Sequence, residues 1–369
     1  FKNITPRDIV NRDSIRNAMV VAMAVGGSTN VMLHAPEIAR AAGYRDFYKD
    51  IMSVEEFNHL STEIVPVIVD ARPFGNYSMV DIDDKGGIQV FVKDLLDAGL
   101  LNGNTMTCTG MSLSDQIREL NPPQPDGEVI YTVQNPFKPT GGLRLLGGNL
   151  SPEYSAVLKL AGVEGGLENN VFTGFARVFN GEQSLLDFLD STPEDLLDHD
   201  MIIVRFEGPV GGPGMPEMLD STSRITAICR ERNIVVGLMT DGRFSGGSVG
   251  LVIGHVGPEA AIGGPIALVE NGDSIEVNLN KNELNCKELA SADLAKKRLQ
   301  DWEDSLDPKS KLHPSLGVAD TRLLNRMRQS AVSAVFGAGM HPNREIWVPD
   351  PRAPVFCDFL PKNKHKPSQ

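Results

Sequence analysis

The stretch VVGLMTDGRFSGGSVGLVIGHVGPEAAIGG, residues 235–264, decides how the rest of the chain is interpreted. Its first apolar residues, with Ile234 before them, have the length and composition of a short buried strand. Residues 240–248 then place three glycines among small polar residues, which predicts a tight loop whose backbone N–H groups can approach a ligand. Apolar residues resume at 251–255, and Pro258 is expected to begin a helix. A plain β-turn between two strands is the alternative interpretation of the loop.

A second loop rich in glycine and proline, RFEGPVGGPGMPEM at residues 205–218, follows another strand-like run at 201–204. The restricted backbone of proline and the freedom of glycine shape such a loop more than side-chain packing does. Glu217 is expected at a helix N-terminus, where the helix dipole stabilises a carboxylate. The same carboxylate could instead hold a hard cation with open positions for a substrate.

Four long motifs occur in a fixed order in this half of the chain: GPVGGPGMPEM, TDGRFSGG, IGHVGPEA and GGPIALVENGD. Together they resemble the C-terminal half of the dihydroxyacid dehydratase and phosphogluconate dehydratase family, which includes the sugar-acid dehydratases. The resemblance extends from about residue 4 to about residue 280. It implies a hydro-lyase that converts a 2,3-dihydroxy acid into a 2-keto acid, with Ser245 as the base and Glu217 as a Mg²⁺ ligand.

The turn GGSTN at residues 26–30 also matches the family, where this turn lies near the active site. Ser28, Thr29 and Asn30 could each cap the following helix, or they could bind the substrate carboxylate at its N-terminus. His34, four residues further on, could contact the substrate, support a residue that does, or pack against neighbouring side chains, and packing is the favoured interpretation.

The remaining candidates lie in the loop after residue 239. Arg243 either binds the substrate carboxylate or pairs internally with Asp241, whose expected role is to orient the loop. Ser248 could donate to a substrate hydroxyl. For His255, a structural hydrogen bond is favoured over acid–base catalysis.

The resemblance further implies an iron–sulfur cluster (2Fe-2S or 4Fe-4S), whose cysteine ligands belong to an N-terminal half that precedes these residues. Cys108, Cys229, Cys286 and Cys357 are scattered without a CxxC pattern, so we expect reduced thiols and no cluster ligand among them. The chain begins at Phe1, without an initiator methionine, and is expected to be a fragment of a longer enzyme. A catalytically incomplete paralogue that keeps the fold is the alternative.

The composition of the 369 residues restricts the possible partners. A formal net charge of −13 argues against nucleic acid, and no stretch approaches the ~18 apolar residues of a membrane span. The absence of the GxxxxGK[ST] and GxGxxG patterns disfavours a nucleotide-binding module. We expect a small dihydroxy acid as the ligand, a homodimer or homotetramer by resemblance, and a cytoplasmic location, or an organellar one in a eukaryote.

The expected fold class is α+β, with an α/β N-terminal portion and a β-rich, barrel-like C-terminal domain. We place the cluster-binding α/β portion at residues 1–120, a Pro-rich linker at 121–138, the barrel-like domain at 139–345 and a tail at 346–369. Strands are expected over the ranges 65–69, 105–109, 143–146, 156–160, 175–179, 201–206, 235–239, 266–269 and 275–279. Helices are expected over 13–25, 31–42, 54–60, 88–98, 286–304 and 323–335.

Within the family, a branched-chain dihydroxy acid is the favoured substrate, which implies a role in branched-chain amino-acid biosynthesis. The GGSTN, TGMSL and GNLSPE segments fit that branch best. A sugar acid is the alternative, although it would require extra polar or basic groups that the sequence does not locate.

Overall fold

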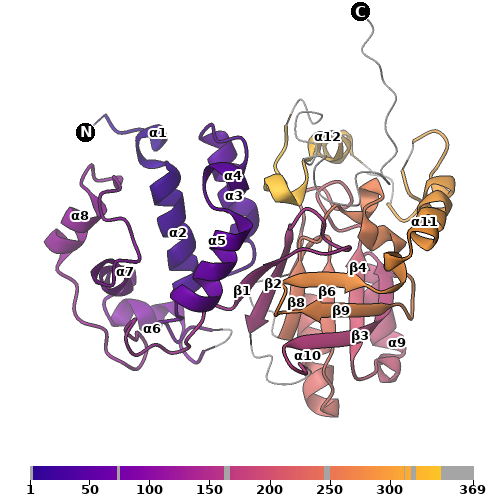
Figure 1. Ribbon diagram of the computed structural model, residues 1–369, viewed down its shortest axis with the longest axis horizontal. Coiled ribbons are helices and arrows are strands. Elements are labelled where there is room, and N and C mark those ends of the chain that lie inside the picture. The colour runs from indigo at the N-terminus through magenta and orange to yellow at the C-terminus, as the bar shows by residue number, and fades with distance from the viewer. Residues whose placement is uncertain are drawn as a thin grey trace, which may run out of the picture.

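The computed structural model describes residues 3–72, 75–161, 167–244, 250–310, 312–316 and 321–341. A helical portion stands on one side of an eight-stranded sheet that curves into a barrel (Figure 1). The α+β class and the barrel-like sheet expected from the sequence are therefore confirmed. No helix in the described ranges is both long and apolar enough to cross a membrane.

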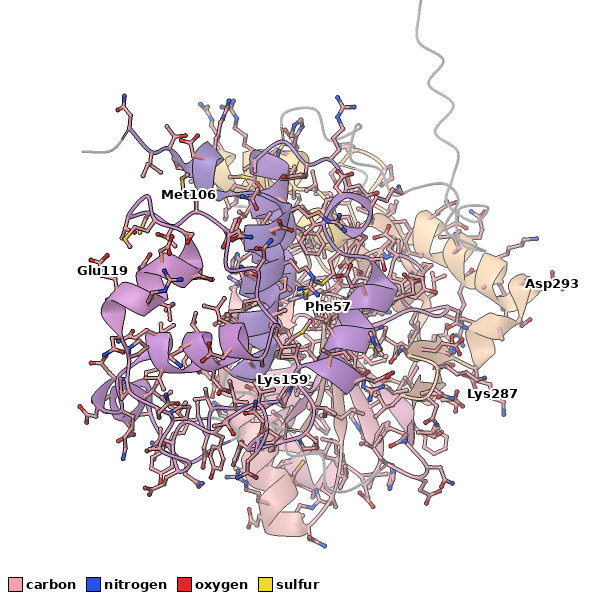
Figure 2. The ribbon with its side chains drawn as sticks, turned by 60° about the vertical axis from the view of Figure 1, so that its left-hand side comes forward. Phe57, Met106, Glu119, Lys159, Lys287 and Asp293 are labelled. Atoms are coloured by element: carbon pink, nitrogen blue, oxygen red, sulfur yellow. The ribbon has the colours of Figure 1, made fainter. Side chains whose placement is uncertain are left out.

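The N-terminal portion is built from short helices. They are α1 (Pro6–Ile9), α2 (Arg12–Ala24), α3 (Val31–Ala41), α4 (Phe47–Asp50), α5 (Val54–His59), a π-helical turn (Leu60–Ile64), α6 (Met79–Asp84), α7 (Ile88–Asp97) and α8 (Leu113–Leu120). The side chain of Asn11 caps α2 by accepting from the N–H of Ser14, and α2 buries Met19 and Met23 one turn apart. Phe57 lies in the interior in Figure 2, whereas Glu119 and Asp293 mark opposite sides of the molecule.

The barrel has the strand order β1-β2-β8-β6-β4-β3-β9-β10. Its strands are β1 (Leu143–Leu146), β2 (Ala156–Ala161), β3 (Val171–Asn180), β4 (Asp200–Arg205), β6 (Gly237–Thr240), β8 (Gly250–Gly254), β9 (Ser274–Asn278) and β10 (Glu283–Cys286). The four strands β3, β4, β6 and β8 are mutually parallel, and the other pairs are antiparallel. A single bridge from Gly147 to Glu283 joins the two edge strands, where the N–H of Leu284 donates to Gly147 O at 2.8 Å.

Both faces of the central strands are covered, which explains their continuous apolar sequences. In β4, Met201 and Ile203 point into the barrel core, while Ile202 and Val204 pack outward. That outer layer includes α9 (Glu182–Ser191) and α10 (Asp220–Arg232), which lie in the crossovers between parallel strands. Leu145 on β1 belongs to the core of the helical portion, so the two halves share a packed boundary.

The remaining elements follow the barrel or connect its strands. They are the two-residue strands β5 (Glu217–Met218) and β7 (Arg243–Phe244), the helices α11 (Ala292–Ser305) and α12 (Arg322–Ser330), and 3₁₀ turns at Pro193–Asp195, Ala260–Ile262, Pro265–Leu268, Glu288–Ala290 and Ala334–Phe336.

Several expected elements differ from the structure. The apolar run 266–269 is not a strand but the 3₁₀ turn Pro265–Leu268, which begins at a proline. The run is apolar because the turn is buried, and so its composition resembles that of a buried strand. The strands expected at 65–69 and 105–109 reduce to isolated bridges, such as Val67 with Lys138 and Met106 with Ser112. The helix expected over 286–304 begins only at Ala292, after β10.

Three further boundaries also change. The helix expected over 323–335 ends at Ser330. Pro258 does not start an α-helix, because only the 3₁₀ turn Ala260–Ile262 follows it. Glu217 lies in β5, three residues before α10, and so does not stand at a helix N-terminus.

Candidate active site

The two motif loops leave the barrel at the same edge. Strands β4 and β6 are adjacent and parallel, so the loops that follow Arg205 and Thr240 both start at the carboxyl end of the sheet. Beyond that edge, β5 and β7 pair in parallel, with Glu217 opposite Arg243. The pairing brings together two motifs that the sequence separates by a helix and a strand.

Glu217 is the centre of a polar contact between the two halves of the molecule. The Nδ2 group of Asn30, at the start of α3, donates to Glu217 Oε1. Arg243 Nη1 lies 3.7 Å from the same oxygen, and Arg243 Nε donates to the carbonyl of Met215. Because the Glu217 side chain is 39% exposed, the carboxylate keeps access to solvent while an amide and a guanidinium hold it.

The GGSTN turn contributes one side chain to this contact. Asn30 makes no side-chain cap on α3, so the capping interpretation is wrong for it. Its Oδ1 is buried and has no partner among the described residues. Ser28 Oγ accepts from the N–H of Asn30 at 3.2 Å, and Thr29 is buried. Within the described ranges, neither residue bonds to Glu217 or Arg243.

The carboxylate of Asp241 anchors the start of the loop after β4 through backbone hydrogen bonds. It is fully buried, and its carboxylate accepts from the N–H groups of Phe206 and Glu207 at 3.0 Å and of Ala260 at 2.9 Å. Burial raises the pKa of Asp241 even against these three hydrogen bonds. Since Arg243 pairs with Met215 and Glu217 instead, the expected internal Asp241–Arg243 pair is wrong. The sequence predicts that Asp241 orients its own loop, whereas its carboxylate bonds to the loop after β4 and to Ala260.

Two residues that the sequence analysis missed hold the middle of the same loop. Glu259 accepts from the N–H groups of Val210 at 2.9 Å and Gly211 at 3.0 Å. Arg328 on α12 donates to the carbonyls of Val210 at 2.9 Å and Gly211 at 3.4 Å. Glu259 follows directly on the GHVGP motif, which offered a signal, but nothing in the polar sequence of α12 distinguishes Arg328.

His255, at the end of β8, is buried beside this loop. Its backbone N–H donates to Gly242 O at 2.9 Å, but neither ring nitrogen has a partner in the described part of the chain. Burial, with the charges of Arg243 and His34, lowers the pKa of His255 to about 3. The structural hydrogen bond expected of the ring is therefore not found there. His34 is exposed on α3, which disagrees with the favoured interpretation that it packs against neighbouring side chains.

Ser245 and Ser248, the expected base and hydroxyl donor, lie outside the described residues. They belong to the segment between β7 and β8, and Ser245 follows Arg243 by two positions.

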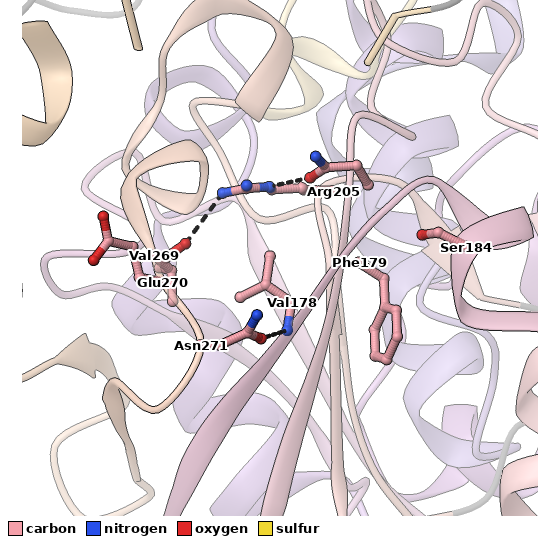
Figure 3. A pocket seen from close by; sticks show the side chains of 8 residues that line it. Val178, Phe179, Ser184, Arg205, Val269, Glu270 and Asn271 are labelled. Carbon is pink, nitrogen blue, oxygen red and sulfur yellow. Dashed lines mark hydrogen bonds between the residues drawn. The ribbon is translucent and has the colours of Figure 1, made fainter. Parts of the chain in front are cut away.

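The larger cavities lie elsewhere along the barrel. Two adjoining hollows of about 480 and 570 Å³ run beside β3 and share Val178, Phe179 and Asn271. Figure 3 shows the first, where Arg205 donates to Asn180 and Val269, and Asn271 accepts from the N–H of Val178. None of the candidate residues from the sequence lines either hollow.

Comparison with known proteins agrees with this division into two halves. The sequence profile described as dihydroxy-acid/6-phosphogluconate dehydratase N-terminal matches residues 1–116, and the C-terminal profile of the same family matches residues 128–338. The dihydroxy-acid dehydratase of Acidothermus cellulolyticus is 43% identical over 302 residues, which cover 82% of this chain and 50% of that protein.

Two further relatives, both also named dihydroxy-acid dehydratase, match to a similar degree. That of Leifsonia xyli is 45% identical over 77% of this chain and 47% of its own length, and that of a Nocardioides species is 45% identical over 75% and 46%. The chain spans about half the length of the curated relatives it matches. With both profiles matched in order, the chain belongs to the dihydroxy-acid/6-phosphogluconate dehydratase family.

Proposed function

We propose that the protein containing this chain dehydrates a 2,3-dihydroxy carboxylic acid to a 2-keto acid, with a branched-chain dihydroxy acid as its substrate. The observation that carries the proposal is the parallel pairing of β5 with β7, which sets Glu217 opposite Arg243. Ser245 follows Arg243 by two positions in the sequence. The names of the relatives support the same reaction.

Ser245 is proposed as the base. It removes the proton from C2 of the substrate, and the hydroxyl group on C3 departs as water after taking up a proton. The resulting enol tautomerises to the 2-keto acid, so atoms and charge balance without an oxidant. Arg243 is proposed to bind the substrate carboxylate, since a guanidinium suits a carboxylate and this one lies in the same contact as Glu217.

The residues around Glu217 fit a Mg²⁺ ion. Glu217 offers a solvent-accessible carboxylate, and the buried Oδ1 of Asn30 has no partner in the described ranges. Carboxylate and amide oxygens are the donors that hard divalent cations prefer. When bound, Mg²⁺ would act as a Lewis acid on the departing hydroxyl and on the developing enolate.

The described cysteines do not fit an iron–sulfur cluster. Within the described ranges, the one group of three candidate ligand side chains is Asp273, Cys286 and Glu288, which holds a single thiol. Arg298 forms an ion pair with Asp273 there, so a positive charge already occupies the group. We propose that the iron–sulfur cluster implied by the family is held by residues other than the described cysteines.

Two alternatives lead to different outcomes. A sugar-acid dehydratase would share the mechanism but act on aldonic acids, and an incomplete paralogue would keep the fold without turnover. A homodimer or homotetramer and a cytoplasmic location remain part of the proposal.

The test uses the complete open reading frame, purified anaerobically with Mg²⁺. Formation of 2-keto acid would be measured from 2,3-dihydroxyisovalerate and from a panel of aldonic acids. Ser245→Ala should abolish turnover, while the control Ser184→Ala, whose hydroxyl donates to Gly181 O beside the β3 cavity, should not.

The outcomes separate the alternatives. Turnover of the branched-chain acid that Ser245→Ala abolishes supports the proposal as stated. Turnover of aldonic acids alone would move the substrate to sugar acids, and no turnover by a metal-loaded protein would leave an incomplete paralogue.

A further inference from the structure

The ring of His255 is a buried polar group for which the described fold supplies no partner. Only 1% of His255 is exposed, and both Nδ1 and Nε2 lack a hydrogen-bond partner among the described residues. Leaving a buried donor or acceptor unpaired destabilises the folded state. An unpaired group of this kind therefore requires an explanation, such as a ligand that completes it.

The backbone of His255 is also held in a defined conformation. His255 has φ 59°, in the left-handed region that residues other than glycine seldom adopt. Its N–H donates to Gly242 O, and the N–H of Val256 donates to Thr240 O at 3.1 Å. Two hydrogen bonds therefore tie this turn to the loop that carries Arg243.

The charges around the ring also determine its protonation state. Arg243 and His34 both lie within electrostatic reach and disfavour a second positive charge, so the imidazole is neutral. A neutral imidazole has one N–H donor and one acceptor nitrogen. A hydroxyl group can both accept and donate, whereas a carboxylate can only accept.

We propose that His255 is a catalytic residue that contacts the substrate and binds one of its hydroxyl groups, while Arg243 binds the carboxylate. This inference rests on the proposed function, because it assigns the hydroxyl contact within the same site. It also assigns the two residues to different parts of a dihydroxy acid.

The experiment compares His255→Leu and His255→Asn with the wild-type enzyme produced from the complete open reading frame. The matched control is His199→Leu. His199 has nearly the same backbone conformation (φ 63°), but it precedes β4, whereas His255 follows β8, and its ring is partly exposed. Unfolding free energy, kcat and KM would be measured for each variant.

We expect His255→Leu to lower kcat/KM by about 100-fold or more, because a buried hydrogen bond to the substrate is lost. Its stability without substrate should match that of His199→Leu or exceed it, since an apolar side chain replaces an unpaired polar ring. His255→Asn keeps one amide group near the ring position and should recover part of kcat/KM.

The stability measurement needs no substrate and so tests the inference separately from the proposed function. If His255→Leu is destabilised well beyond His199→Leu, the ring is bonded within the protein and the inference is wrong. Unchanged kcat and KM in His255→Leu would also overturn it. Failure of the wild-type enzyme to turn over any dihydroxy acid would instead contradict the proposed function.

Discussion

Two regions of the barrel differ in how many of their polar atoms have hydrogen-bond partners. Beside β3, the hollow that contains Arg205 is lined by groups that already have partners: Arg205 donates to Asn180, Ala267 and Val269. Around Glu217 and Arg243, by contrast, Asn30 Oδ1 and both ring nitrogens of His255 are buried without partners in the described ranges. The difference indicates that unsatisfied buried atoms, rather than volume, mark the place prepared for a ligand.

The largest effect should come from removing the central carboxylate. Glu217→Gln keeps the size and the contact with Asn30 but removes the charge, so we expect turnover to fall by about 10³-fold and Mg²⁺ affinity to fall with it. Isothermal titration with Mg²⁺ and the keto-acid assay measure the two effects.

Glu270→Gln is the matched control for this change, because Glu270 lines the β3 hollow and its side chain is 66% exposed. It should keep activity within about twofold. Equal losses in both variants would mean that the two regions do not differ as we conclude.

The next effect concerns the support of the loop after β4. Asp241→Asn replaces a carboxylate that accepts three backbone N–H bonds with an amide that places an NH₂ against at least one of them. We expect the free energy of unfolding to fall by about 3 kcal/mol, measured by urea denaturation. Asp301→Asn, on the exposed face of α11, should change it by less than about 0.5 kcal/mol, and an equal change would contradict the role of Asp241.

How far the sequence predicts this arrangement depends on the range of each contact. The apolar runs of β4 and β8 predict buried strands because parallel strands are covered on both faces. The run at 266–269 looks the same, yet it is a 3₁₀ turn, since apolar composition reports burial and not backbone geometry.

The site shows the same limit more strongly. Glu217 and Arg243 could be placed together because each follows a neighbouring parallel strand. The bond from Asn30 to Glu217 joins residues 187 positions apart, and that from Arg328 to Val210 spans 118. Such contacts depend on how the helical portion and α12 pack on the barrel, which local patterns do not encode.

A smaller effect should appear as a pH dependence near the site. Glu153 is held by Ser333 Oγ at 2.9 Å, its Oε1 has no partner in the described ranges, and burial raises the pKa of Glu153 to about 7. A raised pKa means that the folded state binds the proton more tightly than the unfolded state does. The stabilisation is therefore complete below the unfolded value of about 4.5 and is lost as pH rises through about 7.

Glu153→Gln should remove this dependence. Between pH 5 and pH 8 the wild-type protein should lose about 2 kcal/mol more unfolding free energy than the variant, measured by urea denaturation at each pH. Parallel curves for the two proteins would show that water or another group already satisfies the carboxylate.

The smallest effect should come from the hollow beside β3. Asn271→Ala removes the acceptor for the N–H of Val178, a 2.7 Å hydrogen bond at the edge of β3. Because that edge is partly exposed, water can replace the lost acceptor, and we expect about 1 kcal/mol of destabilisation with kcat and KM unchanged within about twofold. Urea denaturation and the keto-acid assay on the same preparation measure both. A large rise in KM without a matching loss of stability would mean that the substrate extends into this hollow, and a polar, longer acid would then fit better than a branched-chain one.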